Sequence, residues 1–453
     1  MLFMPFNILG IYFRGLLSIA ILVGGVYLLS RWYDESRVPI LPEASTSPRP
    51  NVGDENHGAK PARDETNTAS SERRFRFNPG FNKPTALLAS ALGLLIWGTL
   101  GNLVGQGVGM LTRGKPNPGV RSEPGANLPE GVKQSSGVGG VVDSPRDERT
   151  GEVHWIDRPD GSKLRVECYG PPDAPPIVFT HGWGGNSTSF FYPKMGLAKK
   201  FRLIVWDEPG LGLSKKPDNN DYRIEKLAAD LQAVLAAFAG KKPAILVGHS
   251  IGGMIVLTFC RVFHEALRSE VAGLVLVHTT YKDPVKTTVG AELYTLLEKP
   301  VLAPMMRVMI ALWPLFWVMT WLSYLNGSLH RSTAKSSFAG TETQDQLNFC
   351  TSWAPHARPD IVARGMLGMM AFDETATLAT IDVPTLVVVG DKDTTTPPQA
   401  GRTISDSILG AELATLSPAR HMGLIERHLT FDPLLARFSE ACFAAKAANW
   451  PKV

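Results

Sequence analysis

A serine stands between glycines at positions 248 to 253, where the sequence reads GHSIGG. A short apolar run precedes this segment and a longer one follows it, so we expect a sharp turn from a strand into a helix. A nucleophile on such a turn needs small neighbours, because side chains two residues to either side would collide with the backbone. The pattern predicts Ser250 as an exposed hydroxyl nucleophile, with Gly248 and Gly252 supporting the turn.

Such a nucleophile needs an acid that orients its base, and two aspartates follow the apolar run 385–389. Asp393 lies further past the end of this run than Asp391, and it precedes the turn-forming segment 394–398. We therefore predict that Asp393 is the catalytic acid. Asp391 is the alternative, and we expect it to shape a turn instead.

The base should follow the next strand, and His421 lies just after the strand-like run 412–416. Its position completes the chain order Ser, Asp, His that accompanies a serine on a strand-to-helix turn. His278, at the end of another apolar run, is the alternative base, but it precedes both aspartates. We predict that His421 is the base.

Attack on a carbonyl also needs donors for the oxyanion that forms, each worth about 3 to 4 kcal/mol. The loop HGWGG at 181–185 follows the apolar run 177–180. We predict that the backbone N–H groups of Trp183 and Ile251 form an oxyanion hole, with His181 and Gly182 supporting the loop. A glycine-rich turn without this role is the alternative.

The elements that must position these residues alternate along the chain from about residue 153 onward. Short apolar runs predict strands at 177–180, 203–206, 244–247, 273–278, 385–389 and 412–416, and helical spacing predicts helices at 224–238 and 252–264. Strands separated by helices favour an α/β fold with a mostly parallel sheet covered on both faces.

Residues 151–445 resemble the α/β-hydrolase superfamily. The resemblance rests on five segments in the same order: 181–183, 206–214, 248–253, 390–393 and 421–423. It implies that the first segment forms the oxyanion hole through Trp183 and that residues 207–214 shape the loop after the next strand. Esterases, lipases, thioesterases, amidases, peptidases, perhydrolases and some acyltransferases share this fold, so the substrate is not implied. A serine nucleophile argues against the epoxide hydrolase and dehalogenase branches, which use aspartate.

A helical cap is expected over residues 281–375, between the strand that ends at His278 and the strand that precedes the acid. Its segment 300–325 is apolar nearly all round and rich in Met and Trp. Three interpretations stay open: a hydrophobic substrate pocket, a surface that dips into a bilayer, or a helix pair packed on itself. We expect the cap to favour a lipophilic ester over a sugar or a peptide.

Two apolar segments precede the catalytic region, at 1–30 and 84–111, and each reaches the roughly 20 residues that span a bilayer. We predict a transmembrane helix at each. Gly101, Gly105 and Gly109 are spaced to let another helix approach the second one closely, and a Gly-rich helix end without a partner is the alternative. A cleaved signal peptide is the alternative for the first segment, although no basic region precedes it and no A-x-A-like site follows it.

The remaining N-terminal segments are polar. Residues 31–83 predict a disordered loop, residues 112–150 a Gly-, Pro- and Ser-rich linker, and residues 446–453 a C-terminal tail. Lys and Arg are more numerous in the 31–83 loop than just beyond the second apolar segment. The positive-inside tendency then places this loop in the cytoplasm and the catalytic domain outside, although Arg14 counts against this orientation.

Composition excludes other classes of partner. A formal net charge of +4 over 453 residues is too small and too scattered to favour nucleic acid. The four cysteines form no CxxC pair, and no histidine lies at metal-ligand spacing. The predicted chemistry requires no cofactor and no metal, and the sequence does not indicate an oligomeric state.

These observations predict a membrane-anchored serine hydrolase that cleaves a small lipophilic carboxylic ester through an acyl-enzyme. Acyl transfer, perhydrolysis or thioester hydrolysis on the same triad are the alternatives among enzymes. From another class, the domain would be a ligand receptor that keeps the triad without turnover, or a scaffold for membrane partners.

Overall fold

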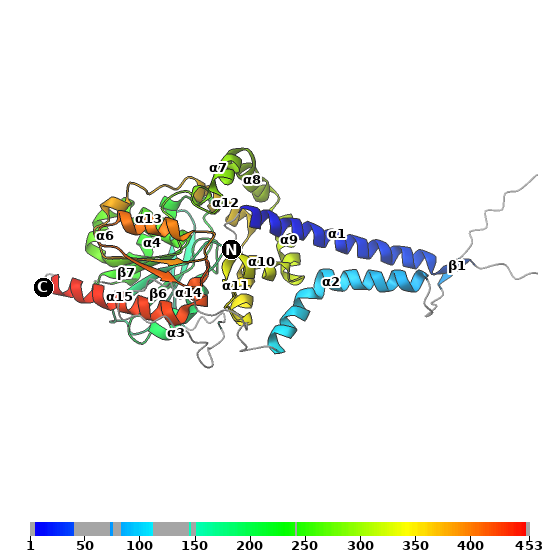
Figure 1. The fold of residues 1–453 in the computed structure, drawn as a ribbon, viewed down its shortest axis with the longest axis horizontal. Coiled ribbons are helices and arrows are strands. Elements are labelled where there is room, and N and C mark those ends of the chain that lie inside the picture. The colour runs from blue at the N-terminus through cyan, green and yellow to red at the C-terminus, as the bar shows by residue number, and fades with distance from the viewer. Residues whose placement is uncertain are drawn as a thin grey trace, which may run out of the picture. The chain divides into compact units, whose positions relative to one another are not determined.

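The computed structural model describes residues 5–39, 73–75, 83–111, 145, 151–240 and 242–449 (Figure 1). Within them, side chains are described for residues 19–36, 83–97, 145, 151–240 and 242–446. The chain divides into two compact units, which we call the helical unit, Ile19–Thr99, and the sheet unit, Met1–Ser18 with Leu100–Val453.

An eight-stranded sheet lies at the centre of the sheet unit, in the order β10-β9-β8-β7-β5-β6-β4-β3. Its strands are β3 (Glu152–Asp157), β4 (Lys163–Tyr169), β5 (Pro176–Thr180), β6 (Arg202–Trp206), β7 (Ala244–His249), β8 (Val271–Val277), β9 (Thr385–Gly390) and β10 (Glu412–Leu416). β3 and β4 run antiparallel to each other, and β4 runs antiparallel to β6, whereas all other neighbours are parallel. This confirms the predicted, mostly parallel sheet.

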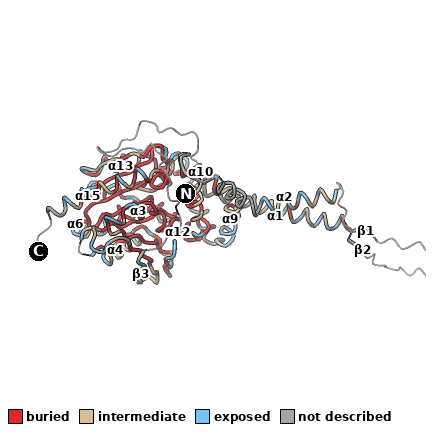
Figure 2. Tube along the Cα trace, turned by 90° about the horizontal axis from the view of Figure 1, so that it is seen from below, coloured by how far each residue is buried: buried red, intermediate tan, exposed pale blue. Residues whose placement is uncertain are grey.

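Helices cover both faces of the sheet, which is why the central strands are apolar and buried along their whole length (Figure 2). On one face lie α3 (Phe191–Leu197) and α15 (His428–Asn449), whose apolar side chains share a core with the strands. On the other lie α4 (Ile224–Phe238), α5 (Ile251–Val262) and α13 (Pro398–Ser407). There Gly401 of α13 lies so close to Val389 that a side chain at this position would collide with it.

The insertion between β8 and β9 folds into helices at one end of the sheet unit (Figure 1). They are α7 (Ala291–Leu297), α8 (Ala303–Ala311), α9 (Trp313–Leu325), α10 (Ser328–Ser337), α11 (Gln344–His356) and α12 (Pro359–Met370). The apolar segment predicted at 300–325 is broken at Leu312, where Pro314 begins the next helix. The pair Ala291–Ala311 and Trp313–Leu325 is bent by 95°.

Two long helices make up most of the helical unit: α1 (Pro5–Glu35) and α2 (Lys83–Leu111). Gly25 allows them to approach, because a Cβ there would lie 3.0 Å from the Leu95 side chain and 3.3 Å from the Ala91 carbonyl. The predicted glycine contact at 101, 105 and 109 lies outside the residues whose side chains are described. Lys83 and Glu35 form a 3.0 Å ion pair at the other end.

The predicted loop 31–83 is not wholly irregular. α1 continues to Glu35, and β1 (Arg37–Pro39) pairs antiparallel with β2 (Arg73–Phe75). The other residues of that loop and nearly all of the predicted linker 112–150 lie outside the described residues.

The predicted membrane spans at 1–30 and 84–111 are helical but are not supported as spans. Within the described residues, no unbroken helix combines the length and apolarity that crossing a bilayer requires. By length and composition alone, the bent pair formed by α7 to α9 meets that requirement.

Candidate active site

Ser250 lies at the turn between β7 and α5 in a backbone conformation that side chains rarely adopt, with φ 56° and ψ −118°. The Ser250 N–H donates to the Val277 carbonyl at 2.9 Å, and the Thr279 hydroxyl donates to the Ser250 carbonyl at 2.6 Å. A Cβ at Gly248 would collide with the Gly252 carbonyl, and one at Gly252 would collide with the Thr180 carbonyl. Both glycines are therefore needed for this turn, as the sequence predicts.

The structure brings the three predicted catalytic side chains together in one hydrogen-bonded chain. His421 Nε2 lies 3.0 Å from the Ser250 hydroxyl, and His421 Nδ1 lies 2.8 Å from Asp393 Oδ2. All three side chains are buried. This geometry allows Nε2 to accept the serine proton while the carboxylate holds the proton on Nδ1.

Asp393 is held in place by the loop that follows it. Its Oδ1 accepts hydrogen bonds from the N–H groups of Thr395, at 2.8 Å, and Thr396, at 3.1 Å, and its Oδ2 accepts one from the Thr396 hydroxyl at 2.8 Å. Burial alone would raise the pKa of Asp393, but the imidazoles of His421 and His278 hold it well below its ordinary value. The carboxylate is therefore ionised at neutral pH.

His421 is neutral in this arrangement. Burial lowers the pKa of its imidazole below 6.5, and the adjacent Asp393 carboxylate only partly offsets that effect. A neutral imidazole is the form that can accept a proton from serine.

The two alternative residues lie close to this chain but occupy other positions. Asp391 accepts hydrogen bonds from the Ala419 N–H at 2.8 Å and from the Ser417 hydroxyl at 2.9 Å, so it holds the loop that carries His421. His278 is buried at the end of β8, and its Nδ1 lies 3.5 Å from Asp393 Oδ2. His278 thus lies beside the acid rather than beside the serine hydroxyl.

The predicted oxyanion loop lies beside Ser250. His181 Nε2 accepts a hydrogen bond from the Glu208 N–H at 3.0 Å, and His181 Nδ1 lies 2.9 Å from the Gly182 carbonyl, so this imidazole connects two loops. Ile251 begins α5, where a helix leaves its first N–H groups without intrahelical acceptors. Backbone hydrogen bonds among the described residues do not use the Trp183 N–H.

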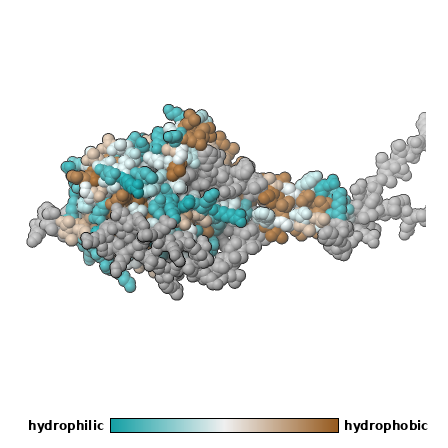
Figure 3. Space-filling view, in the orientation of Figure 1, coloured by the Kyte–Doolittle hydropathy of each residue, from teal (hydrophilic) through white to brown (hydrophobic). Residues whose placement is uncertain are grey.

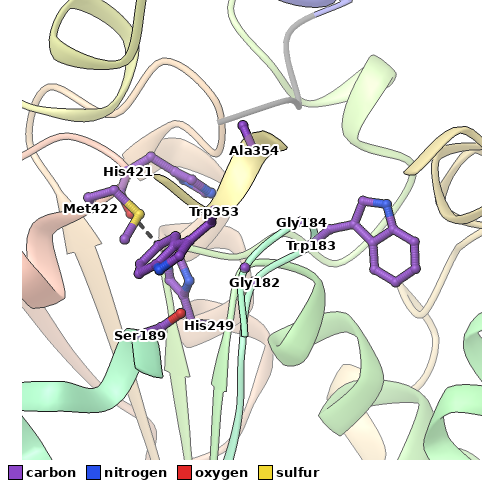
Figure 4. A pocket seen from close by; sticks show the side chains of 10 residues that line it. Gly182, Trp183, Gly184, Ser189, His249, Trp353, Ala354, His421 and Met422 are labelled. Carbon is purple, nitrogen blue, oxygen red and sulfur yellow. Dashed lines mark hydrogen bonds between the residues drawn. The ribbon is translucent and has the colours of Figure 1, made fainter. Parts of the chain in front are cut away.

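The indole of Trp183 has a different role, which the sequence did not reveal. It points away from the pocket (Figure 4) and donates from Nε1 to the Val362 carbonyl of α12 at 3.0 Å. Gly365 of the same helix lies against the indole so closely that a Cβ would collide with it. The side chain therefore joins the oxyanion loop to the cap.

A small pocket opens beside His421. It is lined by Gly182, Trp183, Gly184, Gly185, Ser189, His249, Trp353, Ala354, His421 and Met422 (Figure 4). Its cavity volume is about 30 Å³, enough for a water molecule. Sequence analysis did not identify Trp353 and Ala354 of α11 or Met422 as lining residues, because no local motif marks them.

Asp207 and Glu208 follow β6 and differ in environment. Asp207 accepts hydrogen bonds from the N–H groups of Ser187 at 2.7 Å and Leu213 at 2.9 Å, which orders the loop that the sequence predicts at 207–214. Glu208 is fully buried, and within the described residues neither of its carboxyl oxygens accepts a hydrogen bond. Burial, followed by the nearby Asp207 and Asp230, raises the pKa of Glu208 well above its ordinary value.

The doubly covered sheet, the serine on its strained turn and the later acid and base are the features of an α/β-hydrolase fold. A family model described as alpha/beta hydrolase fold matches residues 175–428, which is more than half of the chain. The chain therefore belongs to this family and is a hydrolase.

Relatives in the family have diverse activities in their names. A putative carbamate hydrolase, RutD, of Stutzerimonas stutzeri is 25% identical over 292 residues, covering 63% of this chain and 100% of the relative. A proline iminopeptidase, PfmaB, of Pestalotiopsis fici is 28% identical over 275 residues, covering 59% and 93%. A thermophilic esterase from Thermogutta terrifontis superposes with a TM-score of 0.53 at 20% identity, covering 64% and 99%. The last likeness shows the fold alone.

Proposed function

We propose that this hydrolase is a membrane-attached serine esterase that cleaves a lipophilic carboxylic ester. The observation that carries the proposal is the unbroken hydrogen-bonded chain from the Ser250 hydroxyl through His421 to Asp393. A neutral imidazole between a hydroxyl and an ionised carboxylate is the arrangement that activates a serine.

In the proposed reaction, His421 Nε2 takes the proton from Ser250 as the serine oxygen attacks the ester carbonyl. The N–H groups of Trp183 and Ile251 stabilise the resulting oxyanion. His421 then passes its proton to the leaving alcohol, which leaves an acyl group on Ser250. Water, deprotonated by His421, attacks this acyl-enzyme, and the release of the carboxylic acid restores the serine.

A lipophilic substrate is supported by the walls beside the serine. Trp353, Ala354 and Met422 supply apolar surface next to His421. An exposed cation that would pair with a carboxylate or a phosphate is not among the residues that line this pocket. An uncharged acyl group therefore suits the site better than a charged one.

Membrane attachment is supported by the outward faces of α1 and α2 in the helical unit. Val23, Tyr27 and Ile96 are each more than half exposed, and Trp97 is 65% exposed. Apolar side chains in this number on two adjacent helices are unfavourable in water and favourable in a bilayer.

Labelling with a fluorophosphonate probe tests the nucleophile. The wild-type chain in detergent should label, and Ser250→Ala should not. Ser189→Ala is the matched control, since Ser189 lines the same pocket and should leave labelling intact. A folded wild-type chain that fails to label would contradict the proposal and favour a receptor or a scaffold.

Hydrolysis of nitrophenyl esters of increasing acyl length tests the substrate class. We expect turnover by the wild type and rising kcat/KM with chain length up to the limit of the pocket. Labelling without turnover would instead indicate a receptor that keeps the triad. Added alcohols that accelerate nitrophenol release and appear in the product would identify an acyltransferase.

A further inference from the structure

The surface of α7, α8 and α9 exposes large apolar side chains. We define the apolar cap face by Leu293, Leu296, Val308, Leu312, Leu315 and Val318. Leu296 is 72% exposed, and each of the others is about half exposed. Figure 3 shows hydrophobic residues gathered on the surface of the sheet unit over α7 and α8. Monomers in water rarely expose a continuous surface of this kind.

α9 buries two polar side chains together with Met319 and exposes apolar ones. Thr320 and Ser323, two of its polar residues, are buried, and the Thr320 hydroxyl donates within the helix to the Phe316 carbonyl at 2.9 Å. Leu315 and Val318 face outward instead. A helix on the surface of a water-soluble domain has its apolar stripe inward, so this arrangement indicates apolar surroundings outside.

Cations predominate along α8 to α10, beside most of the apolar cap face, whereas α7 itself carries the exposed Glu292. Between Lys299 and Thr341 the sequence contains no Asp and no Glu. Four cations lie in this stretch, and all four are exposed: Lys299, Arg307, Arg331 and Lys335. Cations near an anionic bilayer are attracted to it. A neutral apolar partner would not require this charge asymmetry, whereas an anionic lipid surface would be attracted by it.

We propose that the apolar cap face lies in the surface of a bilayer that contains anionic lipid, with α7 to α9 in the plane of the interface. This inference rests on the proposed membrane attachment, because attachment keeps the cap at the bilayer, but it does not depend on Ser250. α9 contacts α11, where the Trp317 indole donates to the Pro355 carbonyl at 2.8 Å. α11 therefore connects the apolar cap face to the pocket, because Trp353 on the same helix lines the pocket.

Quenching by lipid tests whether the face enters a bilayer. An NBD label is attached to the cysteine introduced by Leu296→Cys. The four native cysteines are all buried, so this label reacts selectively with the new cysteine in the folded full chain. The chain is reconstituted in vesicles of equal parts phosphatidylcholine and phosphatidylglycerol, with and without doxyl-phosphatidylcholine. Leu409→Cys is the control, since Leu409 is 97% exposed between α13 and β10. We expect doxyl lipid to remove most emission at position 296 and none at position 409.

A charge reversal tests the role of the cations. Lys299→Glu combined with Arg307→Glu should reduce quenching at position 296 in the anionic vesicles. Arg402→Glu, which reverses an exposed charge on α13, should not. Equal quenching in the double variant and the wild type would overturn the anionic-lipid part of the proposal.

Other outcomes separate this inference from the proposed function. If the NBD label at position 296 is not quenched although the chain co-floats with vesicles, the inference is overturned but the membrane attachment is not. An emission that is unquenched and already blue-shifted would show that a second copy or another segment covers the face, which also overturns it. Failure to co-float would overturn the attachment and the inference together. Ser250→Ala should be quenched like the wild type, so a failed esterase assay leaves this test intact.

Discussion

His421 lies between a hydroxyl and a carboxylate, and its surroundings determine which protonation state it adopts. The carboxylate at 2.8 Å favours the charged form, whereas full burial favours the neutral form and has the larger effect. At Asp393 the balance is reversed. Burial favours the neutral carboxyl, but the two imidazoles together have the larger effect and favour its ionised form. The two groups therefore differ in charge although they share the same buried space.

The pH profile of kcat/KM should reflect this neutral base. As pH falls through the lowered pKa of His421, the imidazole is protonated and can no longer accept the serine proton, so the acid limb should lie below pH 6.5. Asp393→Asn should reduce the rate by roughly 10⁴-fold and move the limb lower, because the carboxylate raises the pKa of His421.

Asp391→Asn is the matched control for this profile. Asp391 holds the Ser417–Ala419 loop and does not contact the imidazole, so its substitution should leave the acid limb in place. An acid limb above pH 6.5 in the wild type, or an unchanged limb in Asp393→Asn, would contradict the assignment.

Glu208 should make the folded state less stable as pH rises. Its raised pKa means that the folded state keeps a proton that the unfolded chain releases above about pH 4.5. Stability should then fall by about 1.4 kcal/mol per pH unit until the folded-state pKa is reached. Glu208→Gln has no such proton, so at neutral pH it should be more stable than the wild type.

Urea denaturation in mild detergent at several pH values measures this effect. The stability gain of Glu208→Gln should disappear at and below pH 4.5, where both chains are neutral at this position. Glu440→Gln, on an exposed carboxylate, should stay within about 0.5 kcal/mol of the wild type throughout. A gain that does not vary with pH would show that Glu208 is not protonated at neutral pH.

Residues that act through a local backbone pattern were predictable from the sequence. The Ser250 turn depends on glycines two positions away, and Asp393 and His421 each follow a strand directly. Glu208 was not identified, because its raised pKa arises from burial by residues far along the chain. Asp391 was expected to shape a turn, but the sequence did not show which residues it would hold, because its partners at 417 and 419 come from the next strand–loop segment.

At the scale of elements, the Trp183 side chain connects α12 of the cap to the loop after β5. The Trp183 indole bonds to Val362 and packs edge-on against Tyr222 at 5.8 Å between ring centroids. The backbone of the same residue supplies a predicted oxyanion donor. A change in the position of α12 is therefore transmitted to the oxyanion loop.

Trp183→Phe tests this connection. It keeps the backbone N–H but removes the indole hydrogen bond to the Val362 carbonyl, a loss of about 1 kcal/mol, and it loosens the loop. We expect kcat to fall roughly 10-fold, with fluorophosphonate labelling retained. Trp155→Phe, on the exposed strand β3, should leave kcat unchanged. An unchanged kcat in Trp183→Phe would show that the loop holds its position without the cap.

Sequence analysis predicted that the cap is helical and apolar but not how its helices are arranged. Periodicity identifies a helix but does not show where Pro314 bends the chain or which face of α9 is buried. Trp353 lines the pocket because of how α11 packs, and no sequence motif marks that packing. The mostly parallel sheet, by contrast, followed from the alternation of apolar strands and helices along the chain.

At the scale of the whole molecule, two units with different surfaces share one chain. The helical unit is held by close packing at Gly25 and by the Lys83–Glu35 ion pair. The sheet unit is held by a core that extends through both faces of its sheet. The predicted contact at Gly101, Gly105 and Gly109 lies outside the residues whose side chains are described and stays a prediction, whereas the close approach at Gly25 was not predicted from the sequence.

Gly25→Leu should separate α1 from α2. The larger side chain would meet Leu95 and the Ala91 carbonyl, whereas at Gly93 a Cβ has open space around it. Disulfide formation between cysteines placed at Glu35 and Lys83 measures the pairing in detergent. We expect it to slow several-fold in Gly25→Leu and to stay unchanged in Gly93→Leu. Equal rates would show that α1 and α2 stay paired without the close approach at Gly25.

The indole contact on α12 also limits how this enzyme can be re-engineered. Recombination experiments often treat the segment between two strands as an exchangeable module. A foreign cap placed between β8 and β9 would have to present a carbonyl where Val362 does and a glycine where Gly365 allows the indole to enter. Libraries of grafted caps should therefore yield active members mainly when they retain this small patch of α12, even if every catalytic side chain is left untouched.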